Sequence, residues 1–110
     1  MTVCFCGCGD RAVHLHHCVT RAEIRRWTNG TGRSFAAMTD ARNLVPLAWD
    51  CHGSHHARAR TLPLTMLPDS VFDFASELMG AGSASVYLAR HYSGTDARLD
   101  ALVAEWERAA

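Results

Sequence analysis

The spacing of hydrophobic and polar positions divides the chain into short strands and helices. Residues 13–19 alternate loosely between the two kinds, which predicts a short strand with Leu15 and His17 on one face. The other face carries two imidazoles and a thiol: His14, His16 and Cys18. Residues 43–48 read Asn-Leu-Val-Pro-Leu-Ala and predict a second strand, and Pro46 indicates that this strand lies at an edge.

Two helices are expected around these strands. Thr20 with Glu23 forms a capping box, so a helix should begin there, run through Trp27 and end in the loop 29–32. Asp50 is an expected N-cap for a helix that follows the second strand. That helix would carry one thiol and three imidazoles: Cys51, His52, His55 and His56.

The last third of the chain predicts three more helices. Asp69 or Ser70 should cap a helix over 71–79, with Gly80 as its stop, and residues 84–91 should form another. The final helix is expected after a cap at Thr95, with apolar residues at helical spacing: Leu99, Leu102, Val103 and Trp106.

A chain of 110 residues is the size of one small domain, and the elements predict an α+β fold. We expect a part rich in Cys and His at 1–64. A helical extension at 65–110 would pack on that part or bind a partner.

The zero net charge conceals a split between these two parts. Residues 1–64 hold eight arginines and four acids, whereas residues 65–110 hold three arginines and seven acids. The chain contains no lysine, which either favours phosphate binding by arginine or reflects a GC-rich coding sequence. Candidate DNA contacts, each with a solvated surface position as the alternative, are Arg21, Arg25, Arg26, Arg42, Arg58 and Arg60.

The chain lacks an apolar run near 18 residues and a signal-peptide pattern, so we expect no membrane span and a cytoplasmic location. Three of the five cysteines lie within five residues, which is a poor layout for disulfides and favours metal binding. Cys18 is expected to be a small core side chain.

The most informative residues are four histidines and one asparagine. The pair His16-His17 precedes Asn43, and His52 and His56 follow. Histidines four residues apart share one face of a helix and can bind one ion, and an imidazole is also a general base near neutral pH.

This order, with Asn-Leu-Val-Pro-Leu before His-x-x-x-His, resembles the HNH endonucleases over residues 4–60. The resemblance implies a ββα-metal core, a β-hairpin packed on a helix around one divalent ion. The segment 67–78 resembles the tails of small phage-encoded HNH proteins. The resemblance over residues 4–60 implies that His17 is the general base and that the side-chain oxygen of Asn43 orients its ring by accepting the proton on the far nitrogen. The implied metal ligands are His16, His52 and His56. His55 is a rival to His56 at helical spacing.

The same resemblance implies a structural zinc on cysteine knuckles, of which this chain keeps only part: Cys4, Cys6, Cys8 and Cys51. Degenerate or reactive thiols are the alternative. The catalytic ion would be Zn, Ni, Mn or Mg, and the partner would be DNA. A homodimer or a phage or host protein could use the C-terminal helices. The alternative function is a non-catalytic, zinc-containing nucleic-acid-binding module on the same scaffold.

Overall fold

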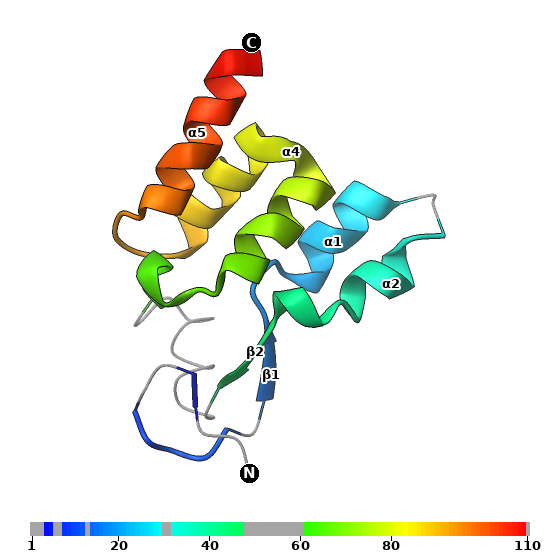
Figure 1. Cartoon of the computed structure of the whole chain (residues 1–110). Coiled ribbons are helices and arrows are strands. Elements are labelled where there is room, and N and C mark those ends of the chain that lie inside the picture. Colours follow the sequence, from blue (N-terminus) through cyan, green and yellow to red (C-terminus); the bar gives the residue numbers. More distant parts are fainter. Residues whose placement is uncertain (1–3, 6–7, 13, 30–31, 48–60, 110) are drawn as a thin grey trace.

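The computed structural model describes residues 4–5, 8–12, 14–29, 32–47 and 61–109, and the fold is α+β, as expected. Its elements in chain order are β1 (His14–His17), α1 (Arg21–Thr28), α2 (Ser34–Met38), the 3-10 turn η1 (Ala41–Asn43), β2 (Leu44–Leu47), the 3-10 turn η2 (Leu64–Met66), α4 (Asp69–His91) and α5 (Ala97–Ala109). The strands lie at the end of the molecule that holds the N-terminus, and α4 runs between α1 and α5 (Figure 1).

The two predicted strands pair as an antiparallel sheet. Leu15 lies opposite Pro46, and His17 lies opposite Leu44. His16 is 1% exposed whereas Leu15 is 64% exposed, so the predicted alternation of faces is confirmed. In a sheet of two strands each strand is an edge, which is where Pro46 can be tolerated.

The helix after β1 begins at its predicted cap. The Thr20 hydroxyl accepts a hydrogen bond from the Glu23 backbone N–H at 3.2 Å. The reciprocal half of the capping box is replaced by one contact within α1 and one contact to α4. The Glu23 carboxylate accepts from the Trp27 indole N–H at 3.3 Å, and the Thr20 N–H donates to the Tyr87 hydroxyl at 2.9 Å. The start of α1 is therefore attached to α4.

The long helix α4 consists of two helical segments, because the backbone of Gly80 leaves the helical conformation (φ 82°, ψ 159°). This confirms the predicted stop at Gly80. The predicted caps were wrong, since the helix begins at Asp69 itself. The Asp69 carboxylate binds Arg98 at 2.9 Å, and the Ser70 hydroxyl donates to the Arg42 carbonyl at 3.1 Å.

Asp96, rather than the predicted Thr95, caps the last helix, and its carboxylate accepts from the Arg98 backbone N–H at 2.8 Å. Leu102 is buried as the apolar spacing predicted, while Trp106 is 53% exposed. The sequence predicted no helix at Ser34–Met38, a five-residue segment without a side-chain cap.

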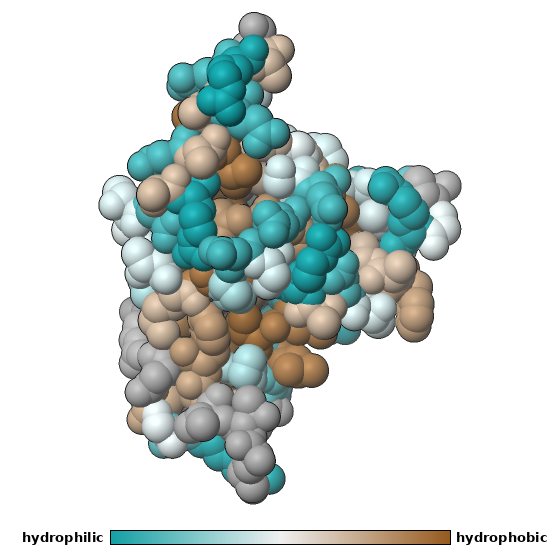
Figure 2. Space-filling model, viewed as in Figure 1, coloured by the Kyte–Doolittle hydropathy of each residue, from teal (hydrophilic) through white to brown (hydrophobic). Residues whose placement is uncertain are grey.

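One hydrophobic cluster joins the two parts expected from the sequence, with Ile24 and Val45 from the first and Leu88 and Leu102 from the second. Figure 2 shows hydrophilic side chains over the outer faces of α1 and α5. Among the described residues, no helix has the length and apolarity to cross a bilayer. The helix expected after Asp50 lies outside the described residues.

Candidate active site

His16 is held in the core by a tyrosine from the end of α4. Its Nε2 lies 3.1 Å from the Tyr92 hydroxyl, and that hydroxyl donates to the Cys18 carbonyl at 2.6 Å. A carbonyl can only accept, so the single phenolic proton is used there. His16 must therefore donate to Tyr92 through Nε2–H, which makes Nδ1 the nitrogen with the lone pair when the ring is neutral.

The chemistry of this arrangement fits a metal ligand. Metal-binding histidines usually donate their second ring N–H to a protein group, which fixes the tautomer and the direction of the ring. Tyr92 fills that position for His16, and burial raises the pKa of Tyr92, so its hydroxyl stays protonated. The structure thus fixes which tautomer a neutral His16 ring adopts, with Nδ1 as the donor atom.

The half-buried ring of His17 is oriented by the end of α2. Its Nε2 lies 3.0 Å from the carbonyl oxygen of Met38, the last residue of that helix. Since the carbonyl accepts, Nε2 carries the proton and Nδ1 is the basic nitrogen. The expected hydrogen bond from His17 to Asn43 was wrong, because the Met38 carbonyl takes that place.

Asn43 instead fixes the loop that follows the histidine pair. Its side chain is fully buried, with Oδ1 accepting from the Val19 N–H at 2.7 Å and Nδ2 donating to the Val19 carbonyl at 2.9 Å. Its own carbonyl accepts from the Cys18 N–H at 2.9 Å. Three hydrogen bonds therefore hold the first two residues after His17, so Asn43 orients the histidines through the backbone.

Sequence reasoning missed the two tyrosines that support this loop, Tyr87 in α4 and Tyr92 just after it. Tyr92 binds His16, and Tyr87 accepts from the Thr20 N–H, yet both lie more than 60 residues from these partners. Their only sequence signal is aromatic residues near the end of a predicted amphipathic helix. Cys18 is 1% exposed and burial raises the pKa of its thiol to about 12, which confirms its role as a core side chain.

The predicted structural zinc site is only partly described. Cys4 is buried and Cys8 is exposed, and Cys6 and Cys51 lie outside the described residues. The Cys4 N–H donates to the Asp10 carbonyl at 2.8 Å, which brings these two residues together. Zinc binding by these thiols stays a prediction.

The other predicted ligands also lie outside the described residues: His52, His56 and the rival His55, together with Arg58 and Arg60. Within the described ranges, no group of three His, Cys, Asp or Glu side chains is placed to hold an ion. Of the three implied ligands for the catalytic metal, the structure therefore describes His16.

The predicted DNA-contacting arginines fall into two kinds. Arg21, Arg25 and Arg26 are exposed on α1. Arg42 instead binds the carboxylates of Asp40 and Glu77 and lies over the Phe74 ring at 5.6 Å. Its guanidinium lowers the pKa of Asp40, mainly by hydrogen bonding. Two carboxylates therefore offset the charge of Arg42, which disfavours a phosphate contact at this residue.

No protein family, curated protein or solved structure matches this chain.

Proposed function

We propose that the chain is a metal-dependent DNA endonuclease of the HNH type, which hydrolyses a phosphodiester bond with one divalent ion. The observation that supports this most strongly is the tautomer of the histidine pair. The Nε2 atoms of His16 and His17 are both held by protein oxygens, so each ring, when neutral, has its lone pair on Nδ1. A metal ligand and a general base both require such a lone pair.

The proposed metal site uses His16 through Nδ1, with His52 and His56 as the remaining protein ligands. A bound divalent ion would supply stabilisation of the negative charge that develops on the phosphate and on its leaving oxygen. The protein's part is to fix the ligand atoms. Tyr92 fixes the ligand atom of His16. Its hydroxyl accepts the proton of Nε2–H, so Nδ1 is the atom that would bind the ion.

His17 is the proposed general base. Its Nδ1 would take a proton from the attacking water, while Nε2–H remains bonded to the Met38 carbonyl. The imidazolium formed in this step is stabilised by that carbonyl, which still accepts from Nε2–H. General-base catalysis of this kind contributes about 10²–10⁴-fold to the rate.

Strand geometry gives the two rings separate tasks. Neighbouring residues in a strand point to opposite faces. His16 accordingly reaches the buried Tyr92, whereas His17 reaches the end of α2 on the other side of β1. Asn43 holds the backbone just beyond the pair, so both directions are fixed together.

Plasmid nicking tests the proposal. The wild type, His17→Ala and the control His14→Ala would be incubated with supercoiled plasmid and Zn²⁺, Ni²⁺, Mn²⁺ or Mg²⁺, and metal content would be measured alongside. We expect His17→Ala to lose about 10²–10⁴-fold in nicking rate at unchanged metal content. His14→Ala, changed on the same strand, should retain nicking.

Two results would count against this function. If the wild type nicks plasmid DNA with none of the four ions, the proposed nuclease activity is refuted. If it then still binds DNA, the zinc-containing binding module is the better description. If the wild type and His17→Ala nick the plasmid at the same rate, His17 is not the general base.

A further inference from the structure

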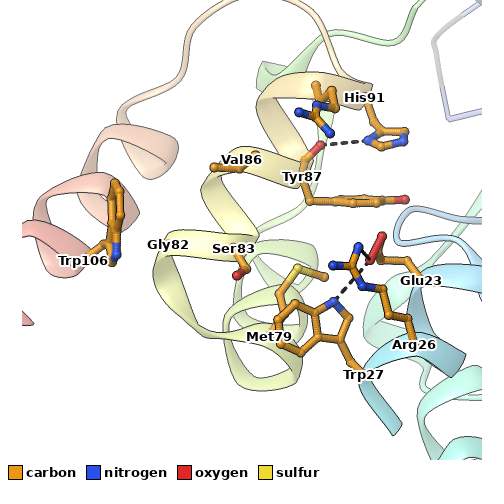
Figure 3. A pocket seen from close by; sticks show the side chains of 11 residues that line it. Glu23, Arg26, Trp27, Met79, Gly82, Ser83, Val86, Tyr87, His91 and Trp106 are labelled. Atoms are coloured by element: carbon orange, nitrogen blue, oxygen red, sulfur yellow. Dashed lines mark hydrogen bonds and ion pairs between the residues drawn. The ribbon is translucent and has the colours of Figure 1, made fainter. Parts of the chain in front are cut away.

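A groove of about 370 Å³ lies between α1 and the helices α4 and α5. Its lining includes aromatic and cationic side chains together with Met79, Ser83 and Val86. Figure 3 shows Trp27 and Tyr87 facing the same space from α1 and α4, with Trp106 set apart on α5. The candidate active site does not use this groove.

The aromatic rings of the groove are fixed in place. The Trp27 indole N–H donates to the Glu23 carboxylate at 3.3 Å, which sets the plane of that ring. The His91 ring is stacked on Tyr87, with centroids 4.1 Å apart and planes 20° apart, and its Nδ1 donates to the Tyr87 carbonyl at 2.9 Å. Two flat surfaces, Trp27 and His91, are therefore oriented before any ligand arrives.

Two arginines add positive charge at the same place. The side chain of Arg26 is 75% exposed, and its guanidinium lies 5.9 Å from the Trp27 ring. Arg90 is exposed and forms no ion pair within the described part of the chain. Glu23 is the acid among the lining residues, and its 3.4 Å pairing with Arg26 at the surface is weak.

Flat aromatic surfaces beside exposed guanidinium groups match one class of ligand particularly well. Single-stranded nucleic acid offers bases that stack on aromatic rings and phosphates that bind arginine. We propose that the groove binds a nucleic-acid strand, with a base on Trp27 or His91 and phosphates at Arg26 and Arg90.

The position of the groove connects it to the histidine pair. His91 lines the groove, and the next residue, Tyr92, binds His16. Tyr87, beneath His91, accepts from the Thr20 N–H just after β1. A strand in the groove would therefore run beside the candidate active site. That role rests on the proposed nuclease function, but strand binding requires no metal ion.

Fluorescence anisotropy of a labelled oligothymidylate, in EDTA and over a range of salt concentrations, tests the groove. The variants would be Arg26→Ala and Arg90→Ala, with Arg108→Ala as a control at the exposed end of α5. Each groove variant should weaken binding and reduce the slope of log K against log salt by about 0.7, the loss of one phosphate contact. Arg108→Ala should leave that slope unchanged.

A separate variant tests base stacking on the aromatic part of the groove. His91→Ala removes the outer ring of the stack on Tyr87, and we expect roughly 5–100-fold weaker binding of the oligonucleotide. Because Arg26 and Arg90 are exposed, their variants keep the test valid even if the His91 variant unfolds.

Three outcomes would overturn the proposal. These are no oligonucleotide binding by the wild type, an equal change of slope in Arg108→Ala, or self-association through the groove in place of strand binding. Failure of the nuclease proposal looks different, because His17→Ala and a wild type that never nicks would still bind the strand with the full salt slope.

Discussion

Replacement of Tyr92 by phenylalanine removes one oxygen atom and thereby tests the orientation of His16. The hydroxyl accepts from His16 Nε2 and donates to the Cys18 carbonyl, at 3.1 and 2.6 Å. Tyr92 and His16 are 3% and 1% exposed, so water replaces the lost partner poorly. A buried polar group left unsatisfied costs about 1–3 kcal/mol, and two groups are affected. We expect the free energy of unfolding to fall by about 2–4 kcal/mol.

The same variant should weaken metal binding. Loss of an outer hydrogen-bond partner of a metal ligand typically lowers affinity about 10–100-fold. Urea unfolding measures the stability, and competition with a chelator measures the Zn²⁺ affinity. Far-UV circular dichroism establishes that the variant is folded under the conditions of the metal titration.

Tyr87→Phe is the matched control on the same helix. It removes the hydroxyl that accepts from the Thr20 N–H at 2.9 Å but has no bond to His16. It should lower stability by about 1–3 kcal/mol and leave Zn²⁺ affinity at the wild-type value. If folded Tyr92→Phe binds Zn²⁺ as tightly as the wild type, the assignment of His16 as a metal ligand oriented by Tyr92 is refuted.

The remaining predictions concern the scaffold. Asn43→Ala should lower the free energy of unfolding by about 2–4 kcal/mol in urea titration, because two buried backbone groups lose their partner; an unchanged midpoint would contradict this. Asp96→Asn keeps the helix cap but removes a carboxylate whose pKa Arg98 lowers from 3.8. The charged carboxylate stabilises the fold above its ordinary pKa and ceases to do so as pH falls through the lowered pKa. Below about pH 4, the free energy of unfolding of the wild type should therefore fall more steeply than that of Asp96→Asn. Parallel curves of unfolding free energy against pH would contradict this. Gly82→Ala would place a methyl group 2.7 Å from the Trp106 ring, so this ring must move away. In a background with the other tryptophans replaced, the fluorescence emission of Trp106 should therefore shift to the red. An unchanged emission spectrum would contradict the packing of Trp106 on Gly82.

Local sequence features predicted the elements well. The alternation at 13–19 predicted β1 with its faces, and the positive φ of Gly80 ended a helical segment where expected. Among these elements the errors are the missed helix α2 and several helix starts. Asp69, Ser70 and Thr95 were all expected to cap, but ion pairs and hydrogen bonds from distant residues, or a neighbouring aspartate, determine those ends.

The candidate site was less predictable for a physical reason. Residue type and order indicated His16, His17 and Asn43, but the groups that orient the two rings come from elsewhere in the fold. The Met38 carbonyl belongs to a short helix without sequence signals, and Tyr92 is 76 residues from His16. Backbone carbonyls have no signature in a sequence, and such tertiary contacts become visible only in the folded chain.

The central claim concerns where a divalent ion binds, and anomalous diffraction from crystals soaked in Zn²⁺ tests it most directly. We predict one ion bound by Nδ1 of His16 together with His52 and His56, and an unligated His17 still bonded to the Met38 carbonyl. An ion that avoids His16, or one coordinated by His17, would contradict the account.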